Sequence, residues 1–295
     1  MQRGRRISEA LLAKEKSDAH LLSVDKAEWY QVDRRQLSSL LDATFLQLSF
    51  DREAEEFLAN SLSTSNSICL QTYYTLATLF LQTFITKTSI NGVLDRGGMY
   101  LFSPQHFQQL LDLPPDWIAA DKKMIDLGAG DGAITEVMKQ YYKQASATEA
   151  SQIMQWRLRQ KDITLLPIDG WNDQHFDLIS ALNLLDRHFD PKSLLRDLRK
   201  TALDSNGIVL LAVVLPWSQY VEFNLNDTTS TRATDHITLD GSTFEQQANS
   251  LTEQLLIPAG FQVLRWTKLP YLCEGDSYRA YYKLTDSVFV LKAIP

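Results

Sequence analysis

Two patterns of apolar residues divide the chain near residue 90. Before that point, apolar side chains recur every three or four positions in runs rich in Leu, Ala, Glu, Lys and Arg, over residues 8–16, 25–48 and 51–62. That spacing places apolar side chains on one face of a helix. We therefore predict a helical segment over residues 1–90, which ends before glycine breaks at Asn91-Gly92 and Gly97-Gly98.

An uncharged and largely apolar run, residues 68–85, has a different composition from its helical neighbours. Its polar residues Gln71, Thr72, Thr75, Thr78 and Gln82 share one face of a helix, and Tyr73, Leu76, Phe80 and Phe84 lie near the other. We predict a buried amphipathic helix here. A membrane-spanning helix is the weaker alternative, because such helices carry fewer polar groups.

From residue 122 onward, apolar runs alternate with helix-like runs. Several of the apolar runs, such as residues 208–215, contain almost no polar side chain, which is typical of a strand buried on both faces in a parallel sheet. Alternating strand and helix predicts a doubly wound α/β sheet, Rossmann-like, of seven strands, forming one domain over residues 91–295. The predicted strands are residues 123–128, 144–149, 163–169, 176–182, 207–215, 261–267 and 288–293, and the predicted helices are residues 134–142, 152–160, 192–203 and 244–257.

Composition and charge narrow the choice of partner. The 295 residues carry a formal net charge of −7 and show no clustered basic stripe, which argues against nucleic acid as the main partner. An acidic protein would attract a cationic peptide or a cationic cofactor. The two cysteines, Cys69 and Cys273, fit neither a zinc site nor a disulfide framework, and the five histidines show no metal spacing. No apolar stretch follows the basic start, so we expect neither a signal peptide nor stable membrane insertion, and we expect a monomer.

A glycine-rich turn follows the first strand of the α/β region. The sequence Asp126-Leu-Gly128-Ala-Gly130-Asp-Gly132 lets a ligand lie against the backbone, because Gly128 and Gly130 have no Cβ. A dinucleotide would require G-x-G-x-x-G, and here the third glycine comes one residue early. The carboxylates of Asp126 and Asp131 would repel a pyrophosphate, so we favour a positively charged ligand such as S-adenosylmethionine.

Acidic residues follow the next two predicted strands. Glu149 ends the second strand, where a carboxylate can bind ribose hydroxyls, and Asp169 ends the third, near the expected adenine. Each has a structural alternative: Glu149 could belong to the start of the next helix, and Asp169 could be a turn residue before Gly170.

The fourth strand ends in polar residues that could orient a substrate. Asn183 and Asp186 are three positions apart and would face one pocket if the chain turns helically there. A carboxylate that accepts a hydrogen bond from one imidazole N–H fixes the other nitrogen as the neutral, attacking one, and Asp186 could do this. Helix capping or an ion pair with Arg187 is the alternative role of Asp186.

Two further segments lie near the same predicted edge. Between the last two predicted strands, Tyr271 could donate its hydroxyl to a substrate or close the pocket, whereas Cys273 is expected to serve packing. Residues 217–241, rich in Thr, Asn and Asp, predict a long surface loop that could cover a site at the carboxyl ends of the strands.

The chain resembles a known family, the DREV methyltransferases, also called methyltransferase-like protein nine. The resemblance lies in DRGGMYLFSP at 95–104, DLGAGDG at 126–132, LNLLDR at 182–187, LP at 215–216 with YVE at 220–222, and LPYLCEGD at 269–276. It runs from about Trp29 to the C-terminus, and the first, third and last of these stretches are far more specific than the glycine turn.

The resemblance implies a class I fold and a protein-histidine N-methyltransferase that uses S-adenosylmethionine. Its implied substrates are proteins with His-x-His motifs, methylated on the N1 (pros) nitrogen. Residues implied to hold the cofactor are Asp126, Gly128, Gly130, Glu149, Asp169 and Arg96, and those implied to act on the histidine are Asp186, Asn183 and Tyr271.

Two other functions remain open on the same fold. A small-molecule methyltransferase would use the same sheet, because fold does not fix substrate. A binding module without catalysis would keep the fold, although the acidic pair Asp126 and Glu149 argues against such degeneration.

Overall fold

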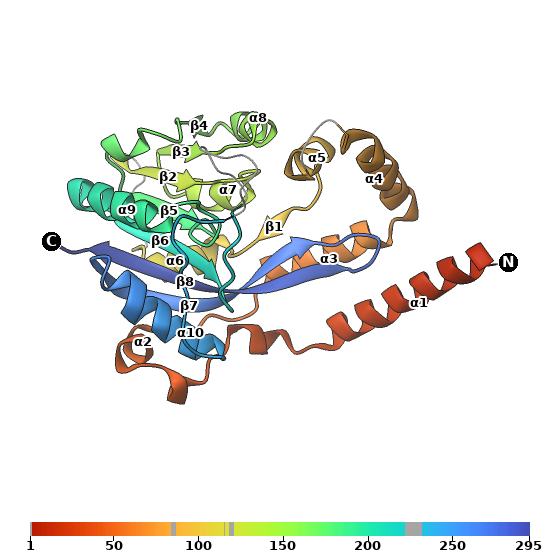
Figure 1. Ribbon diagram of the computed structural model, residues 1–295, viewed down its shortest axis with the longest axis horizontal. Coiled ribbons are helices and arrows are strands. Elements are labelled where there is room, and N and C mark those ends of the chain that lie inside the picture. Colours follow the sequence, from red (N-terminus) through yellow and green to blue (C-terminus); the bar gives the residue numbers. More distant parts are fainter. Residues whose placement is uncertain (1, 84–86, 115, 118–120, 222–231) are drawn as a thin grey trace.

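One eight-stranded sheet forms the centre of the computed structural model, which describes residues 2–83, 87–114, 116–117, 121–221 and 232–295 (Figure 1). The strands are β1 (Met99–Tyr100), β2 (Lys123–Leu127), β3 (Gln144–Thr148), β4 (Thr164–Leu165), β5 (Leu178–Leu182), β6 (Ile208–Val214), β7 (Phe261–Glu274) and β8 (Tyr281–Ala293). Their order across the sheet is β1-β7-β8-β6-β5-β2-β3-β4. Seven strands match the predicted ones, and β1 is an additional short edge strand.

The sheet is parallel in only one part. β2 pairs in parallel with β3 and β5, and the same direction continues to β4 and β6. β8 runs antiparallel to β6, and β7 and β1 then alternate in direction. The predicted all-parallel character therefore holds for five strands. The chain reverses its order of winding between β2 and β5, and the crevice at such a reversal is where α/β proteins bind ligands.

Both faces of the sheet are buried, as the apolar strands predict. In β6, Val209, Leu211 and Val213 join the core on one face, and Leu210 and Ala212 join the core on the other. The first face is covered by α9 (Pro191–Ser205) and α10 (Phe244–Ser250), which continues as a π-helical turn, Leu251–Leu256. The second face is covered by α6 (Pro104–Leu111) and α7 (Ala133–Lys139), and α8 (Gln152–Gln160) packs beside β3 and β4.

The N-terminal segment is helical but more broken than predicted. It contains α1 (Gln2–Ser23), two short 3-10 turns (Lys26–Tyr30 and Arg34–Gln36), α2 (Ser39–Thr44) and α3 (Arg52–Asn66). The single helix expected over residues 25–48 is wrong. Asp25, Asp33 and Ser38 each accept a hydrogen bond from a backbone N–H two or three residues later, so each begins a new short turn.

The prediction of a buried helix over the uncharged run is also wrong. The helix forms as α4 (Ile68–Leu81), followed by α5 (Lys87–Leu94), but α4 exposes 58% of Tyr73, 63% of Leu76 and 69% of Phe80. The buried residues of α4 are instead Gln71 and Tyr74. Gln71 Nε2 donates to Thr64 O at 3.0 Å, which holds this face of α4 against α3. Phe84 lies outside the described residues, as does Glu222. Within the described parts of the chain, no helix combines the length and hydropathy needed to cross a membrane.

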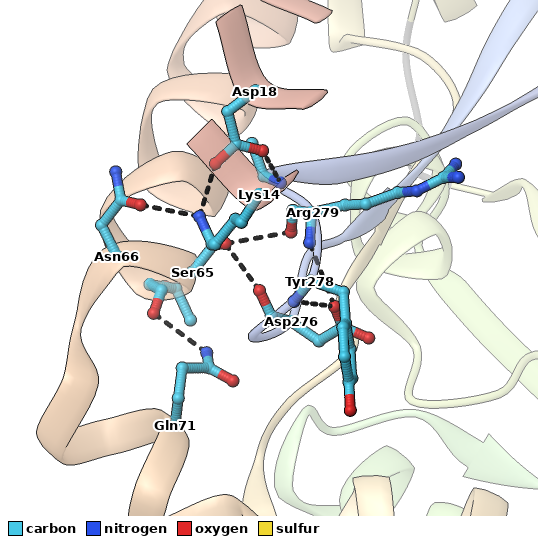
Figure 2. Close-up of polar contacts among 10 residues, drawn as sticks. Lys14, Asp18, Ser65, Asn66, Gln71, Asp276, Tyr278 and Arg279 are labelled. Atoms are coloured by element: carbon cyan, nitrogen blue, oxygen red, sulfur yellow. Dashed lines mark hydrogen bonds and ion pairs between the residues drawn. The ribbon is translucent and has the colours of Figure 1, made fainter. Parts of the chain in front are cut away.

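Polar contacts attach α1 and α3 to the tip of the β7–β8 hairpin (Figure 2). Asp18 Oδ1 accepts from the backbone N–H of Ala280 at 2.7 Å, and the other oxygen of Asp18 pairs with Lys14. Ser65 Oγ of α3 donates to the carbonyl oxygens of Asp276 and Arg279, at 2.6 and 3.0 Å. The long hairpin therefore joins the N-terminal helices to the sheet.

Candidate active site

The glycine turn between β2 and α7 bends through three left-handed residues. Gly128, Gly130 and Gly132 have φ of 69°, 57° and 79°, a region that glycine enters without steric cost. The backbone N–H groups of Gly128 and Ala129 both donate to Thr148 O, at 3.0 and 3.1 Å, which ties the turn to the end of β3.

The three glycines differ in the space around them. A Cβ on Gly132 would lie 2.7 Å from Leu158 Cδ2, so that residue is required for packing against α8. A Cβ on Gly128 would lie 3.1 Å from Leu184 Cδ1. A Cβ on Gly130 would meet only Met99 Cε, at 3.8 Å, so this part of the turn leaves room for a ligand.

Asp126, at the end of β2, is oriented into the protein. Thr135 Oγ1 donates to one of its carboxyl oxygens at 2.5 Å, and Ser180 Oγ donates to the other at 2.7 Å. Burial raises the pKa of Asp126 to about 6, although both hydroxyl donors act in the opposite direction. The carboxyl therefore joins β2 to α7 and β5, and fixes the start of the turn on which a cofactor would lie.

Glu149 connects the end of β3 to the glycine turn. One carboxylate oxygen accepts from Gly130 N at 2.9 Å and the other accepts from Ser151 N at 2.8 Å. Ser151, and not Glu149, is the N-cap of α8, because its side chain accepts from Met154 N. The acid predicted to bind ribose is therefore placed beside the open part of the turn.

The other two residues assigned to the cofactor lie in different settings. Asp169 is exposed in the bend before Gly170, after the short strand β4. Arg96 lies between α5 and β1, where its Nε donates to Asn91 Oδ1 at 2.9 Å and its guanidinium stacks 5.4 Å from the Tyr74 ring centre. It is Met99, three residues later and not selected from the sequence, that approaches Gly130.

The end of β5 brings Asn183 and Asp186 to one corner, and β8 adds an acid that the sequence analysis missed. Asn183 has a left-handed φ of 53° and donates from Nδ2 to Asp286 Oδ2 at 2.7 Å. Asp186 is 5% exposed and Asp286 is fully buried at 0%. The position of Asp286 depends on antiparallel pairing with Val214 and Leu269, which residue spacing alone does not reveal.

One oxygen of each of these three side chains lacks a partner. Asn183 Oδ1, Asp186 Oδ1 and Asp286 Oδ1 are buried and accept no hydrogen bond from any described residue. Arg187 Nε lies 4.0 Å from Asp186 Oδ2, so the ion pair considered from the sequence is present but long. Buried polar atoms are nearly always hydrogen-bonded in folded proteins, so this cluster is suited to a ligand that supplies N–H or O–H donors.

Burial also changes the acidity of the corner. It raises the pKa of Asp186 to about 6, with Arg187 acting to lower it. It raises the pKa of Asp286 to about 8, an effect that the Asn183 hydrogen bond reduces and the charge of Asp186 increases. The site thus holds one carboxyl that is mostly ionised at neutral pH and one that is mostly protonated.

Tyr271 lies within β7 and not between the last two strands, because β7 and β8 extend well beyond their predicted ends. Its hydroxyl contacts Met99 Sδ, and burial raises its pKa well above the ordinary value, so the phenol keeps its proton. Met99 also approaches Gly130, so Tyr271 lies near the glycine turn. Cys273 is a free thiol whose pKa burial raises to about 11, so it is a poor nucleophile.

A cleft of about 460 Å³ opens beside the polar corner. Among its lining residues are Asp186, Arg187, Pro216, Tyr220, Lys283 and Thr285. Pro216, which follows a cis peptide bond, comes just after the end of β6, and the backbone N–H of Tyr220 donates to Asp186 O at 3.0 Å. The loop after β6 therefore forms one wall of the cleft, as its position in the sequence suggests.

A comparison with protein families matches residues 29–293 to the DREV methyltransferases. The chain belongs to this family. The DREV match covers the whole sheet, the glycine turn and the polar corner, and leaves residues 1–28 and the last two residues outside. Together with the strand order, it identifies the sheet as the Rossmann-like fold of class I methyltransferases, with β1 as an eighth strand.

Solved structures also resemble this DREV chain, at low identity. The PH1948 protein of Pyrococcus horikoshii is 10% identical with a TM-score of 0.43, and the match covers 76% of this chain and all (100%) of that one. YcgJ of Bacillus subtilis is 13% identical, with a TM-score of 0.39 and coverage of 65% and 99%. A TehB-like SAM-dependent methyltransferase of Corynebacterium glutamicum is 14% identical, with a TM-score of 0.35 and coverage of 64% and 95%. The family assignment rests on the sequence match and not on these scores.

Proposed function

We propose that this DREV methyltransferase transfers a methyl group from S-adenosylmethionine to the N1 (pros) nitrogen of histidine in proteins with His-x-His motifs. Two parts of the site support the proposal separately. The glycine turn supports the cofactor, and the polar corner, which Asn183 and Asp186 form after β5 with Asp286 of β8, supports the histidine.

The residues at the glycine turn fit S-adenosylmethionine better than a dinucleotide. Gly130 leaves room at the turn, and the carboxylates of Asp131 and Glu149 lie beside it, where they would attract a cation and repel a pyrophosphate. When bound, S-adenosylmethionine supplies a methyl group on a positively charged sulfur. Glu149, whose carboxylate lies beside the open part of the turn, would hold its ribose hydroxyls.

The observation that carries the substrate assignment is the pair of unpartnered acceptors, Asn183 Oδ1 and Asp186 Oδ1. A neutral imidazole has one N–H and one lone pair. If Asp186 accepts that N–H, the second nitrogen would keep its lone pair for attack on the methyl group. That nitrogen would take the methyl group from the sulfonium, which would leave as a neutral thioether, and Asp186 would take up the N–H proton of the imidazolium product.

The acidity of Asp186 suits that proton transfer. Its pKa of about 6 is close to the ordinary histidine value of about 6.5, so the proton moves between the two groups at little cost. Tyr271, which keeps its proton, would donate to the substrate or close the pocket above it. Burial of these groups excludes water from an in-line displacement, which depends on orientation.

A small-molecule methyltransferase is the second candidate. The cleft beside Asp186, at about 460 Å³, falls within the range of pockets that enclose small ligands, about 300–1,000 Å³. Such a ligand would use the same imidazole chemistry without flanking peptide.

The deciding experiment compares substrates under one assay. The protein is incubated with methyl-labelled S-adenosylmethionine and a peptide containing His-Ala-His, with matched peptides in which either histidine is alanine, and with free histidine. Hydrolysis and chromatography then separate N1-methylhistidine from N3-methylhistidine. We expect label in N1-methylhistidine of the His-Ala-His peptide. Label only in free histidine would support the small-molecule alternative, and calorimetry that detects no S-adenosylmethionine binding would contradict both.

A further inference from the structure

The strand β8 carries a carboxyl group whose place in the core has no structural explanation. Asp286 is fully buried, and its backbone pairs regularly with Val214 and Leu269 on either side. Neither pairing requires a side-chain acid. A buried carboxyl without full hydrogen bonding costs folding free energy, so an apolar residue would be more stable here. The side-chain hydrogen bond that Asp286 makes is the one from Asn183, at 2.7 Å.

That single hydrogen bond determines what Asn183 presents to a ligand. An amide has a donor end and an acceptor end, and Nδ2 of Asn183 is occupied by Asp286 Oδ2. The acceptor end, Oδ1, is buried and makes no hydrogen bond within the described structure. The backbone of Asn183 is also held, because it is left-handed at φ 53° and its N–H donates to Ala212 O at 2.9 Å. Only rotation of the amide about its last bond would exchange the two ends.

We propose that Asp286 is a positioning residue of the active site: by accepting from Nδ2 it fixes the Asn183 amide with Oδ1 directed at the substrate. The choice of a substrate that donates an N–H rests on the proposed function. Asp286 itself does not contact the reacting atoms in this role. It ensures that the corner offers the substrate two acceptors, Asn183 Oδ1 and Asp186 Oδ1, instead of one acceptor and one competing donor.

Two substitutions separate this role from a merely structural one. Asp286→Asn keeps a carbonyl oxygen that can accept from Asn183 Nδ2, whereas Asp286→Leu has nearly the same shape and no acceptor. A matched control is Thr267→Val, because Thr267 is buried in the same hairpin, also has an unpartnered side-chain oxygen, and is remote from Asn183 in the hydrogen-bond network.

The first measurement is the rate of methylation of the His-Ala-His peptide. We expect Asp286→Leu to lower kcat by roughly 10-fold to 100-fold, the scale seen when a reacting group is misplaced. S-adenosylmethionine binding should be unchanged, and Asp286→Asn and Thr267→Val should stay within about 3-fold of the original protein. Equal activity of the Leu and Asn variants, whether high or low, would overturn the proposal.

The second measurement does not depend on the substrate assignment. In protein labelled with ¹⁵N-asparagine, the Asn183 side-chain amide is assigned by its loss in Asn183→Ser. Its protons should exchange slowly in the original protein, in Asp286→Asn and in Thr267→Val, and quickly in Asp286→Leu. Slow exchange that persists in Asp286→Leu would overturn the proposal. If the peptide is not methylated at all, the proposed substrate fails, and this measurement still tests Asp286.

Discussion

The two carboxyl groups at the polar corner, Asp186 and Asp286, differ in position and in acidity. Asp186 lies at the edge of the cleft, with a pKa of about 6, and Asp286 lies behind it, with a pKa of about 8. Burial is the main cause of both raised pKa values. Both groups therefore lower the folding free energy gain, and they provide a polar site from which water is excluded. Each can be tested separately, because Asp186→Asn should affect chemistry, whereas Asp286→Asn, which keeps the acceptor for Asn183, should mainly affect stability.

Replacing Asp186 should abolish methylation without loss of the cofactor. Asp186→Asn keeps the shape but offers a competing donor and cannot take up a proton, so we expect peptide methylation to fall by at least about 100-fold, within the range attributed to general acid–base groups. Calorimetry should show unchanged S-adenosylmethionine affinity, because the glycine turn does not include this residue. Asp173→Asn, at an exposed position, is the control. Loss of cofactor binding in Asp186→Asn would assign Asp186 to the wrong half of the site.

Replacing Asp286 should stabilise the protein relative to the original, and the difference in stability should grow as the pH rises. An aspartate in the unfolded chain ionises near pH 4, whereas Asp286 in the folded state does so near 8. Between these values the folded state holds a proton that the unfolded state has lost, so the original protein loses stability with increasing pH. Asp286→Asn lacks this dependence, and its Tm advantage should therefore widen between about pH 4 and pH 8.

The size of that effect is measurable by thermal unfolding. A difference of one proton is worth up to about 1.4 kcal/mol per pH unit, which corresponds to roughly 3–6 °C in Tm for a domain of about 150–250 residues. Thermal unfolding at a series of pH values gives the difference between variant and original protein, in which other titrating groups cancel. Thr267→Val should follow the original protein at every pH. Parallel curves for Asp286→Asn and the original protein would show that Asp286 is ionised throughout.

Among the elements, the glycine turn joins packing and binding in adjacent residues. Gly130→Ala should retain the fold, because only Met99 lies near the new Cβ and the left-handed backbone costs about 1–2 kcal/mol. The same change at Gly132 adds an overlap with Leu158 at 2.7 Å, which should cost about 1–3 kcal/mol more. We expect S-adenosylmethionine affinity to fall at least about 10-fold in Gly130→Ala. Calorimetry checks the affinity, and thermal unfolding compares the stability of the two variants. Equal melting temperatures would contradict the additional cost expected at Gly132.

The elements also show which features the sequence could predict. β5 and β6 could be predicted because strands buried on both faces are mostly apolar runs. The full length of β7 could not be predicted, because Pro270 interrupts the apolar pattern. The strand tolerates Pro270 because the neighbouring strand β1 pairs with β7 only at Leu272 and Cys273. Periodicity also predicted the helix α4 but not which of its faces is buried, since that depends on its contacts with α3.

For the active site, the sequence identified residues at strand ends but not their connections. Asn183 and Asp186 could be selected because a parallel strand ends there, and the structure does bring them together. Asp286 lies 103 positions from Asn183 and meets it only through the antiparallel pairing of β6 with β8. No local pattern encodes that register. The orientation of Asp126 into the protein likewise depends on Thr135 and Ser180 together.

At the scale of the whole molecule, the N-terminal segment divides into a part that the sheet needs and a part attached to it. Trp29, Tyr30, Leu41, Phe45 and Leu48 are all buried in the two main cores, and Leu46 N donates to Trp266 O at 2.8 Å. The helix α1, in contrast, extends away from the sheet and is held near its C-terminal end by Asp18 and Lys14 (Figure 1). The family match begins between these two parts, at residue 29.

Two truncations should therefore behave very differently. Removal of residues 1–24 loses the Asp18 bond to Ala280 N but little apolar burial, so we expect a folded, active protein with Tm lowered by a few degrees. Removal of residues 1–50 also loses those five core side chains, worth roughly 10 kcal/mol, which is comparable with the whole stability of a typical domain, about 5–15 kcal/mol. That protein should not fold. Circular dichroism and thermal unfolding distinguish the outcomes, with Asp18→Ala as the control for loss of the Asp18 hydrogen bond. A cooperative unfolding transition in the longer truncation would show that the sheet is stable without residues 25–50, and would favour the domain boundary predicted near residue 90.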